Sequence, residues 1–380
     1  APLFLLKRAE KLNLMLKTIY IFAFFHNAPG GCSKHLSRFL EQADKDSRFS
    51  YVLFTLAKHE DKYSNFKRID IKSINNIFAN PVSTIFLRLI LSLYINFINN
   101  KAIIIDFFNP IFVPLKVKKI SIIRDLGELD LNKYDFLRQF YRKKIMLPLA
   151  MRFSDRIIAI SESTAKNISK YFPYTKGKIN MIYHGADKPK NKLLNQIRSD
   201  IHYKDYFVYT GRLDSYGKNL INTLKAYNQY IKEGGKNSFF LIGAEWRNTE
   251  KIKEYIRENN LSQHVKVMGF LEEHEKNNLI KNSSGMIFVS LHEGFGHPIL
   301  ECFAFRKQIL TSNISSMPEI GGSAPIYVDP YSVPHIKDGL HKLENFNYDE
   351  DFYTKINFQL NKFSWKKMYK MYTDIFIENL

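Results

Sequence analysis

Cysteine is scarce in this chain of 380 residues, and the two cysteines, Cys32 and Cys302, lie in opposite halves. A framework of several disulfide bonds is therefore excluded, and no cluster of Cys and His residues has the spacing of a zinc site. Two free thiols fit a reducing compartment, so we expect a cytoplasmic location.

Long uncharged apolar runs are also missing. The most apolar stretch, residues 83–98, is shorter than the ~20 residues that a transmembrane helix needs, and Arg88 interrupts it. Residues 3–19 carry charges in their middle and lack the small-residue cleavage site of a signal peptide. We expect both stretches to form buried or amphipathic helices, with a position along a membrane surface as the alternative.

Acidic residues are few in the first half of the chain. Residues 1–190 contain 32 Lys and Arg but 15 Asp and Glu, a net charge of +17, whereas the rest of the chain contributes +2 of the total of +19. A codon bias toward Lys, Asn and Ile could add lysines, but it does not easily explain this asymmetry. The excess predicts an anionic partner for the first half, such as nucleic acid, an anionic membrane or a phosphorylated substrate.

Short apolar runs that alternate with helical patterns are abundant. The chain is 45% hydrophobic, so we expect a large core. Continuous apolar strands between helices indicate parallel sheets covered on both faces. The pattern restarts after a polar linker at residues 188–200, which predicts two doubly wound α/β domains that bind ligands beyond the carboxyl ends of their strands. The expected strands lie at residues 18–25, 51–57, 101–108, 119–126, 155–161 and 179–187, then at 205–213, 237–244, 264–271, 284–291, 308–313 and 324–330.

A first candidate site follows the strand at residues 205–213. Gly211 ends this strand, and Arg212 and Lys218 come next, with five residues between them. Glycine lets backbone amides approach a ligand, and the forked donors of Arg with the mobile charge of Lys suit a pyrophosphate. A solvated turn with surface cations is the alternative, and the stretch is not a Walker loop.

A second candidate site is the stretch SLHEGFGHPILECFAF, residues 290–305. Glu293 stands at the end of an expected strand, where it can accept hydrogen bonds from sugar hydroxyls. The Gly-Phe-Gly turn can aim backbone amides outward, and Pro298 suits the first turn of a helix whose N-terminus attracts phosphate. Glu301 could accept from a ribose diol. A favourable charge near the helix N-terminus would explain Glu301 alone, but not the turn.

These stretches resemble the retaining GT-B glycosyltransferases of family 4. HEGFGHPILECFAF, with its two glutamates separated by seven residues, resembles the family signature, and YTGRLDSYGKNL resembles the phosphate-binding segment. TSNISSMPEIGGSAPIYVDP resembles the segment after the signature in bacterial mannosyl- and rhamnosyl-type members. The resemblance covers roughly residues 18 to 375. It implies a GT-B fold, with two doubly wound Rossmann-like domains that face a central cleft.

The resemblance also implies domain limits and residue roles. Residues 1–190 would bind the acceptor, residues 200–362 the nucleotide sugar, and the helix at 363–380 would pack back on the N-terminal domain. Arg212, Lys218 and Glu293 would carry catalysis. The implied donor-binding residues are Gly211, Arg212, Lys218, Phe270, Leu271, Glu293, Gly294, Phe295, Gly296 and Glu301, of which Phe270 and Leu271 lie near the base and Glu301 at the ribose. The implied cleft residues of the first domain are Gly30, Gly31, Arg124 and Asp125.

The chain departs from the family at one position. Relatives often carry His-Asp where this sequence has Arg124 and Asp125. Arginine stays charged and cannot act as a general base, although it can hydrogen-bond the donor or a phosphate. An ion pair of Arg124 with Asp125 or Glu128 is the alternative.

Two further stretches bear on partners. Residues 136–153 alternate cations with aromatic and aliphatic residues, which predicts an amphipathic helix with a solvated basic face, or contact with anionic lipid or a lipid pyrophosphate. The Asp-Lys-Asp stretch at residues 44–46 matches the metal motif of GT-A enzymes, but its polar surroundings indicate a turn, and we predict no metal site.

The resemblance implies a metal-independent hexosyltransferase without a cofactor. It would move a hexose, with GDP-mannose as the first donor to consider, to a lipid-linked or oligosaccharide acceptor in bacterial polysaccharide or O-antigen synthesis. Catalysis would rest on stabilising the departing diphosphate and orienting the acceptor. The expected location is the cytoplasm, with peripheral contact at the inner face of the cell membrane. The alternatives are a GT-B sugar-nucleotide epimerase and a basic nucleic-acid-binding protein, which would explain the charge but not the glutamate turn.

Overall fold

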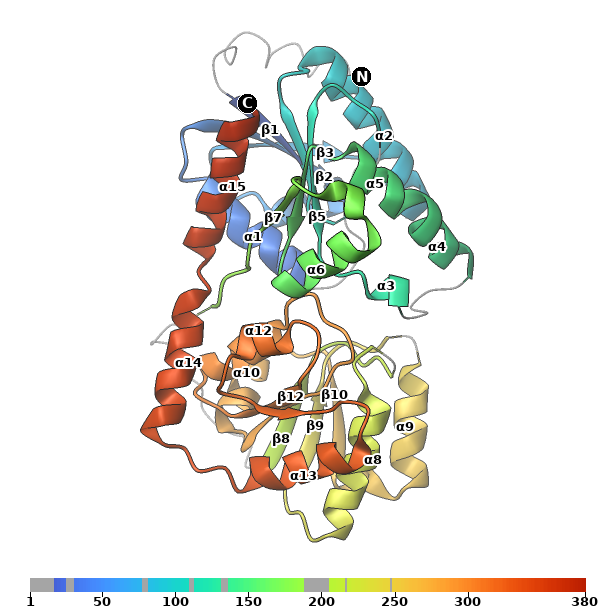
Figure 1. The fold of residues 1–380 in the computed structure, drawn as a ribbon, viewed down its shortest axis with the longest axis vertical. Helices are drawn as coiled ribbons and strands as arrows, with labels where there is room; N and C mark the ends of the chain where they lie inside the picture. The colour runs from blue at the N-terminus through green and yellow to red at the C-terminus, as the bar shows by residue number, and fades with distance from the viewer. Residues whose placement is uncertain are drawn as a thin grey trace. The chain divides into compact units, whose positions relative to one another are not determined.

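The structure is a computed structural model of the chain, and two compact units make up its fold (Figure 1). Unit 1 comprises Ala1–Ile160, Thr164–His184 and Trp365–Leu380, and unit 2 comprises Ser161–Ser163 and Gly185–Ser364. The residues that the structure describes are 17–24, 31–76, 81–108, 113–130, 136–187, 205–215, 217–246 and 248–380.

Unit 1 is built on a seven-stranded parallel sheet with the strand order β3-β2-β1-β4-β5-β6-β7. Ile21 of the central strand β1 pairs with Leu53 on one side and with Ile105 on the other. The order reverses between β1 and β4, which makes a topological switch point there. The strands are β1 (Lys17–Phe22), β2 (Phe49–Leu56), β3 (Ile69–Ile74), β4 (Ile103–Asp106), β5 (Lys118–Ile123), β6 (Arg156–Ala159) and β7 (Ile179–Met181).

Helices cover both faces of this sheet, as its buried strands require. On one face, Leu87 of α2 packs with Phe22 and Ile104. On the other face, α1 packs against α15, where the ring of Phe39 lies 5.3 Å from the ring of Tyr372. The helices are α1 (Gly31–Ala43), α2 (Pro81–Ile98), α3 (Gly127–Asp130), α4 (Phe136–Tyr141), a π-helical turn (Arg142–Met146), α5 (Leu147–Phe153), α6 (Glu162–Tyr171), α15 (Trp365–Asn379) and the 3₁₀ turns Ala57–Lys62 and Pro173–Thr175.

Unit 2 repeats the design with a six-stranded parallel sheet in the order β10-β9-β8-β11-β12-β13. The order reverses between β8 and β11. The strands are β8 (Tyr206–Thr210), β9 (Ser238–Ile242), β10 (Val265–Gly269), β11 (Gly285–Phe288), β12 (Ile309–Ser312) and β13 (Ile326–Val328). The helices are α8 (Leu220–Lys232), α9 (Thr249–Glu258), α10 (Glu273–Asn282), α11 (His297–Ala304), α12 (Met317–Gly321), α13 (Val333–Glu344), α14 (Glu350–Lys362) and the 3₁₀ turn Leu261–Gln263.

The prediction of two doubly wound parallel sheets is confirmed, and each expected strand is present. Strands β1, β2 and β5 begin one or two residues before the predicted limits, and the others lie within them. Strand β3 was not predicted, because its run alternates polar and apolar residues at a sheet edge. The helix expected at residues 3–19 cannot extend past residue 16, since Lys17 begins β1; its earlier part lies outside the described residues, as does the linker at 188–200.

The helices expected at residues 83–98 and 136–153 are present, the second with a π-helical turn in its middle. Within the described part of the chain, no helix is long and apolar enough to cross a membrane. The expected domain limits and the expected cleft stay predictions.

Candidate functional site

The two loops predicted to bind a ligand leave neighbouring strands of unit 2. Strand β8 pairs directly with β11, so the loop after β8 and the loop after β11 start side by side at the switch point of the sheet. The backbone amide of Leu291 donates to the carbonyl of Gly217 at 3.1 Å and links the two loops. This edge is where doubly wound sheets bind their ligands.

Lys218 and Glu293 meet at this edge. The Nζ atom of Lys218 lies 2.5 Å from Oε1 of Glu293, and their side chains are 17% and 15% exposed. The ammonium also lies 5.4 Å from the centre of the Phe288 ring. The structure therefore brings together two of the predicted catalytic residues, a cation suited to phosphate and a carboxylate suited to hydroxyls, in a half-buried and charge-compensated pair.

Two serines fix the backbone that carries Glu293. The hydroxyl of Ser315 accepts from the amide of Glu293 at 3.1 Å and lies 2.8 Å from the carbonyl of the same residue. The buried hydroxyl of Ser316 lies 3.0 Å from the carbonyls of Glu293 and Phe295. Neither serine was predicted, because a serine after a strand carries no signal of its own. Together they hold in place a turn whose flexibility comes from its glycines.

Gly296 ends the turn and caps α11. Its φ of 99° is a left-handed conformation that favours glycine, and Pro298 stands in the first turn of the helix as predicted. Phe295 buries its ring against Phe363 at 5.5 Å, so this residue can offer a ligand only its backbone. Gly294 is buried beside it. The N-terminus of α11 thus opens at the same edge as Glu293, with the positive end of its dipole there.

Three glycines lie side by side, in a row, where the neighbouring strands β8, β9 and β10 end, and they let the backbones approach closely there. Gly211, Gly243 and Gly269 follow or end β8, β9 and β10, and all three have positive φ. The amide of Gly243 donates to the carbonyl of Gly269 at 2.7 Å. A Cβ atom on Gly243 would lie 1.7 Å from the carbonyl oxygen of Gly211, so no side chain fits there. Gly243 and Gly269 were not predicted, and their place beside Gly211 follows from the strand order.

Arg212 is exposed and stacks on a tryptophan. Its guanidinium carbon lies 4.5 Å from the centre of the Trp246 ring, in the loop after β9. Thr249 anchors this loop, because its hydroxyl lies 2.8 Å from the carbonyls of both Leu213 and Trp246. Trp246 was not predicted, although it is one of two tryptophans in the chain. It holds the guanidinium plane of Arg212 beside the strand ends.

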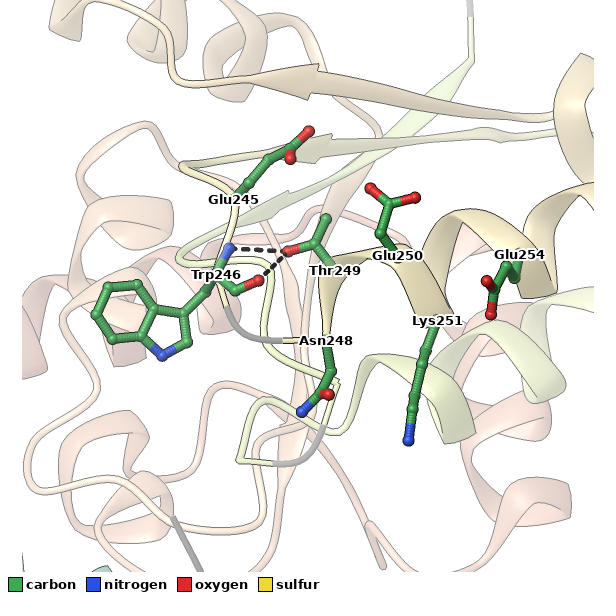
Figure 2. A pocket seen from close by; sticks show the side chains of 7 residues that line it. All are labelled: Glu245, Trp246, Asn248, Thr249, Glu250, Lys251 and Glu254. Atoms are coloured by element: carbon green, nitrogen blue, oxygen red, sulfur yellow. Dashed lines mark hydrogen bonds between the residues drawn. The ribbon is translucent and has the colours of Figure 1, made fainter. Parts of the chain in front are cut away.

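Trp246 also lines an open pocket of about 450 Å³ at the start of α9 (Figure 2). The other lining residues are Glu245, Asn248, Thr249, Glu250, Lys251 and Glu254. Three carboxylates against one ammonium make this pocket unsuited to a diphosphate. The edge with Lys218 remains the better candidate for that ligand.

The remaining predicted donor residues lie in the same unit. Glu301 of α11 forms an ion pair with Lys276 of α10 at 3.2 Å, with both side chains about one-fifth exposed. Phe270, after β10, is 55% exposed, and Leu271 beside it is half-buried. Lys276 was not predicted, because a lysine on a polar helix gives no signal in the sequence. It fixes the carboxylate that was expected to meet a ribose.

Burial and the neighbouring charges keep the hydroxyl of Tyr209 protonated. Burial raises the pKa of the Tyr209 hydroxyl well above its usual value, the charges of Glu293 and Asp214 raise it further, and Arg212 opposes them. The hydroxyl donates to the carbonyl of Arg212 at 2.8 Å. Tyr209 therefore stabilises the loop after β8 as a hydrogen-bond donor to its backbone.

The predicted cleft residues belong to unit 1, after β5 and at the start of α1. Arg124, after β5, donates from Nε and Nη2 to the carbonyl of Phe107 at 3.1 and 2.5 Å, while Asp125 accepts from the amide of Gly127 at 3.0 Å. Gly31 is the exposed first residue of α1, and Gly30 lies outside the described residues. The side chain of Glu128, the alternative partner of Arg124, is likewise outside them.

The two aspartates of the Asp-Lys-Asp stretch accept hydrogen bonds from other residues of unit 1. Asp46 accepts from Arg48 at 2.7 Å and from the hydroxyl of Tyr369 at 2.9 Å, and Asp44 accepts from the amide of Arg68 at 2.7 Å. Across the residues described above, no group of three or more His, Cys, Asp and Glu side chains could hold a metal ion.

Comparison with known proteins shows that the chain is similar to sugar-transferring enzymes. The family described as "Glycosyl transferases group 1" matches residues 195–356, which include both loops of the site. The chain is similar to the "Serotype-specific mannosyltransferase WbdA" of Escherichia coli, 26% identical over 266 residues that cover 65% of this chain and 32% of that protein. The chain thus spans about a third of the length of this relative.

Two other matches extend over almost the whole chain. The "Uncharacterized glycosyltransferase MJ1069" of Methanocaldococcus jannaschii is 25% identical over 389 residues, which cover 95% of this chain and 98% of that protein. The crystal structure of Anabaena Alr3699/HepE in complex with UDP-glucose has the same fold, with a TM-score of 0.71, 15% identity, and coverage of 96% of this chain and 100% of that one.

Proposed function

The chain has the GT-B fold and is similar to glycosyltransferases, and from this premise we propose that the protein transfers a hexose from a nucleotide-diphosphate sugar to a lipid-linked or oligosaccharide acceptor with retention of anomeric configuration. The observation that carries the proposal is the contact between Lys218 and Glu293 at the switch point of unit 2. It joins a phosphate-binding cation and a hydroxyl-binding carboxylate at the place where such sheets bind ligands.

In this proposal the donor separates the pair. The diphosphate of the donor accepts hydrogen bonds from the ammonium of Lys218 and the guanidinium of Arg212. Hydroxyls of the donor sugar donate hydrogen bonds to the carboxylate of Glu293. Each charge that loses its protein partner gains a ligand partner, so no charge is left unpaired in a half-buried site. Glu301, held by Lys276, accepts from the ribose, and the base lies toward Phe270 and Leu271.

The chemical step then depends on the leaving group. Negative charge grows on the departing diphosphate as the bond to the sugar breaks, and Arg212 and Lys218 stabilise that charge. Each such contact is worth on the order of 2–4 kcal/mol of barrier, by analogy with oxyanion donors. The acceptor hydroxyl needs only to be held against the sugar, which positioning accomplishes. No side-chain nucleophile is part of the proposal.

A relative and the charge of the first half of the chain indicate which substrates to test. GDP-mannose is the first donor to test, because the relative WbdA is named a mannosyltransferase. The basic first half, with 32 cationic residues against 15 acidic ones, suits an acceptor that carries a lipid pyrophosphate. Such an acceptor belongs to polysaccharide or O-antigen assembly in the cytoplasm, with peripheral contact at the inner face of the cell membrane.

A thermal-shift screen tests this function. We expect one nucleotide sugar among GDP-mannose, dTDP-rhamnose and the UDP-hexoses to raise the melting temperature saturably, because a ligand of the folded state stabilises it by mass action. The effect should persist at high salt, where non-specific nucleic-acid binding is lost. A protein that no nucleotide sugar stabilises would contradict the proposal. Consumption of the donor without any acceptor would instead indicate an epimerase.

A further inference from the structure

Helix α2 of unit 1 exposes a line of large apolar side chains. Phe86, Ile90, Leu93 and Phe97 follow one another at intervals of four, three and four residues, so they share one face of the helix. Each is more than half exposed, and Phe97 is 90% exposed. The line runs for about 16 Å at 1.5 Å per residue. We call these four residues the α2 stripe.

The inner face of the same helix carries its polar groups. Nε of Arg88 lies 2.6 Å from Oδ2 of the buried Asp106, and Nη2 donates to the carbonyl of Phe24 at 2.6 Å. Thr84 and Ser92 are buried on this face as well. Turning α2 to hide its stripe would leave the charge of Asp106 buried and unpaired, which is strongly unfavourable. The buried ion pair therefore fixes the stripe outward.

Helix α4 extends the apolar surface. Phe136 is 81% exposed and Leu137 is 77% exposed, and Phe140 follows one turn later. Figure 1 shows α4 beside α2 on the same flank of unit 1. Burial raises the pKa of the Tyr141 hydroxyl at the end of α4, and the cations of Arg142 and of Arg88 in α2 oppose that rise, so Arg88 lies near the end of α4. Large apolar side chains that are exposed together on two helices favour an interaction site over a plain solvent-facing surface.

The segment that carries this surface is cationic in sequence. Residues 71–154 contain 13 Lys and Arg against five Asp and Glu, and the five are Asp106, Asp125, Glu128, Asp130 and Asp135. Exposed lysines lie beside the helices: Lys101 and Lys116 near the end of α2, and Lys144 in the turn after α4. The amide of Lys116 donates to Oδ1 of Asn96 at 2.7 Å, which ties that lysine's segment to α2.

From these observations we propose that the α2 stripe and the exposed face of α4 form the surface by which unit 1 lies on an anionic lipid bilayer. The apolar side chains enter the boundary between head groups and acyl chains, and the lysines contact lipid phosphates. The inference rests on the proposed function and deepens it, because it names the residues that bring the enzyme to a lipid-linked acceptor.

A second copy of the chain fits this surface less well. A symmetric dimer places the same patch of each copy face to face. Lys101, Lys116 and Lys144 would then approach the same cations of the other copy, and the 13 cationic residues of the segment 71–154 exceed its five acidic residues. An anionic bilayer supplies the missing negative charge.

Sedimentation with vesicles tests the apolar part of the surface. The full chain should bind vesicles of phosphatidylcholine mixed with phosphatidylglycerol. The double variant Ile90→Ser with Phe97→Ser should bind them at least about tenfold more weakly, because binding scales with buried apolar area. Phe358→Ser is the matched control, since Phe358 of α14 is 71% exposed in unit 2. It should bind like the wild type. Absence of wild-type binding, or equal binding by the double variant, would overturn the proposal.

A second comparison tests the charge and the rival partner. Lys101→Glu with Lys116→Glu should weaken binding to the anionic vesicles at least about tenfold while leaving the nucleotide-sugar thermal shift intact. Equal binding by this variant would overturn the lipid assignment. So would light scattering that shows a dimer of the wild type and a monomer of the stripe variant. A thermal shift that persists in a protein without vesicle binding refutes this inference and leaves the proposed function standing.

Discussion

Lys218 and Glu293 stand 75 positions apart in the chain, yet Nζ of the first lies 2.5 Å from Oε1 of the second. Each belongs to a loop that leaves the sheet of unit 2 at its switch point, one after β8 and one after β11. The pair is compensated in the protein without donor. Its cation suits the diphosphate of a nucleotide sugar and its carboxylate suits the hydroxyls of the sugar next to it, which makes the pair the centre of the proposed donor site.

Replacement of either partner should abolish most turnover. For Lys218→Ala and for Glu293→Ala we expect donor consumption in the presence of acceptor to fall at least about 100-fold, because each change removes a charge that acts on the transition state. Circular dichroism should show an intact fold. Lys370→Ala is the control, since this exposed lysine of α15 pairs with Asp374 on the surface. Activity within a few-fold of wild type in either site variant would refute the role assigned to that residue.

Arg212 and Trp246 should act together. We expect Arg212→Ala to weaken binding of the nucleoside diphosphate about tenfold or more, since a hydrogen-bonded charge is lost. Trp246→Ala should weaken it about two- to fivefold, because an exposed cation–π contact is worth about 0.5–1 kcal/mol. Trp246→Phe should retain most of the affinity, and Phe358→Ala should retain all of it. If Trp246→Ala binds like the wild type in calorimetry, Trp246 does not position Arg212.

The glycine row should be sensitive to a single methyl group. Gly243→Ala places Cβ 1.7 Å from the carbonyl oxygen of Gly211, whereas a Cβ on Gly234, whose φ is 91°, would meet no atom within 4 Å. Gly234→Ala should therefore cost only about 1–2 kcal/mol of conformational strain. Gly243→Ala should lower the free energy of unfolding by more than that and weaken donor binding, because the strand ends must move apart. If urea unfolding gave the same loss of free energy of unfolding for Gly243→Ala and Gly234→Ala, the close contact of Gly243 with Gly211 would not restrict side chains.

Acid should destabilise unit 1 through Asp155. Burial raises the pKa of this carboxyl, but hydrogen bonds from the amide of Lys119 at 2.9 Å and from the Lys119 and Lys118 ammonium groups lower it by more, so the folded pKa is below its usual value. The stability that Asp155 contributes is present above the unfolded pKa of about 3.9 and is lost as the pH falls through the folded value.

Asp155→Asn should consequently be less stable than the wild type at neutral pH, and its free energy of unfolding should fall less steeply below about pH 4. Urea unfolding at several pH values measures both effects. Parallel curves for the two proteins over the acidic range would contradict the assignment.

The two sheets could be predicted because their strands are buried on both faces and appear as continuous apolar runs; all four residues of β4 are buried, for example. Strand β3 escaped because in it only Ile69 is buried, so the run lacks that signal. The apolar character of α2 was visible in the sequence, but its outward direction was not. That direction depends on the ion pair of Arg88 with Asp106, which joins a helix to a strand.

The candidate site was predictable residue by residue but not as an arrangement. Lys218 and Glu293 each carry a local signal, a cation after a glycine and a carboxylate at a strand end. Their contact depends on β8 lying next to β11, and the sequence contains no record of that strand order. The stacking of Arg212 on Trp246 likewise depends on β9 lying next to β8. Residues that act through a neighbouring element leave no local pattern, which is why Trp246, after a strand, and Lys276, on a helix, were missed.

Calorimetric titration of GDP and UDP at high salt tests most directly whether Lys218 binds the donor diphosphate. We expect saturable binding of one of the two nucleotides to the wild type and to Lys370→Ala, and binding weaker by at least about tenfold, or about 1.4 kcal/mol, to Lys218→Ala. Affinity unchanged in Lys218→Ala, or no binding of either nucleotide to the wild type, would contradict it.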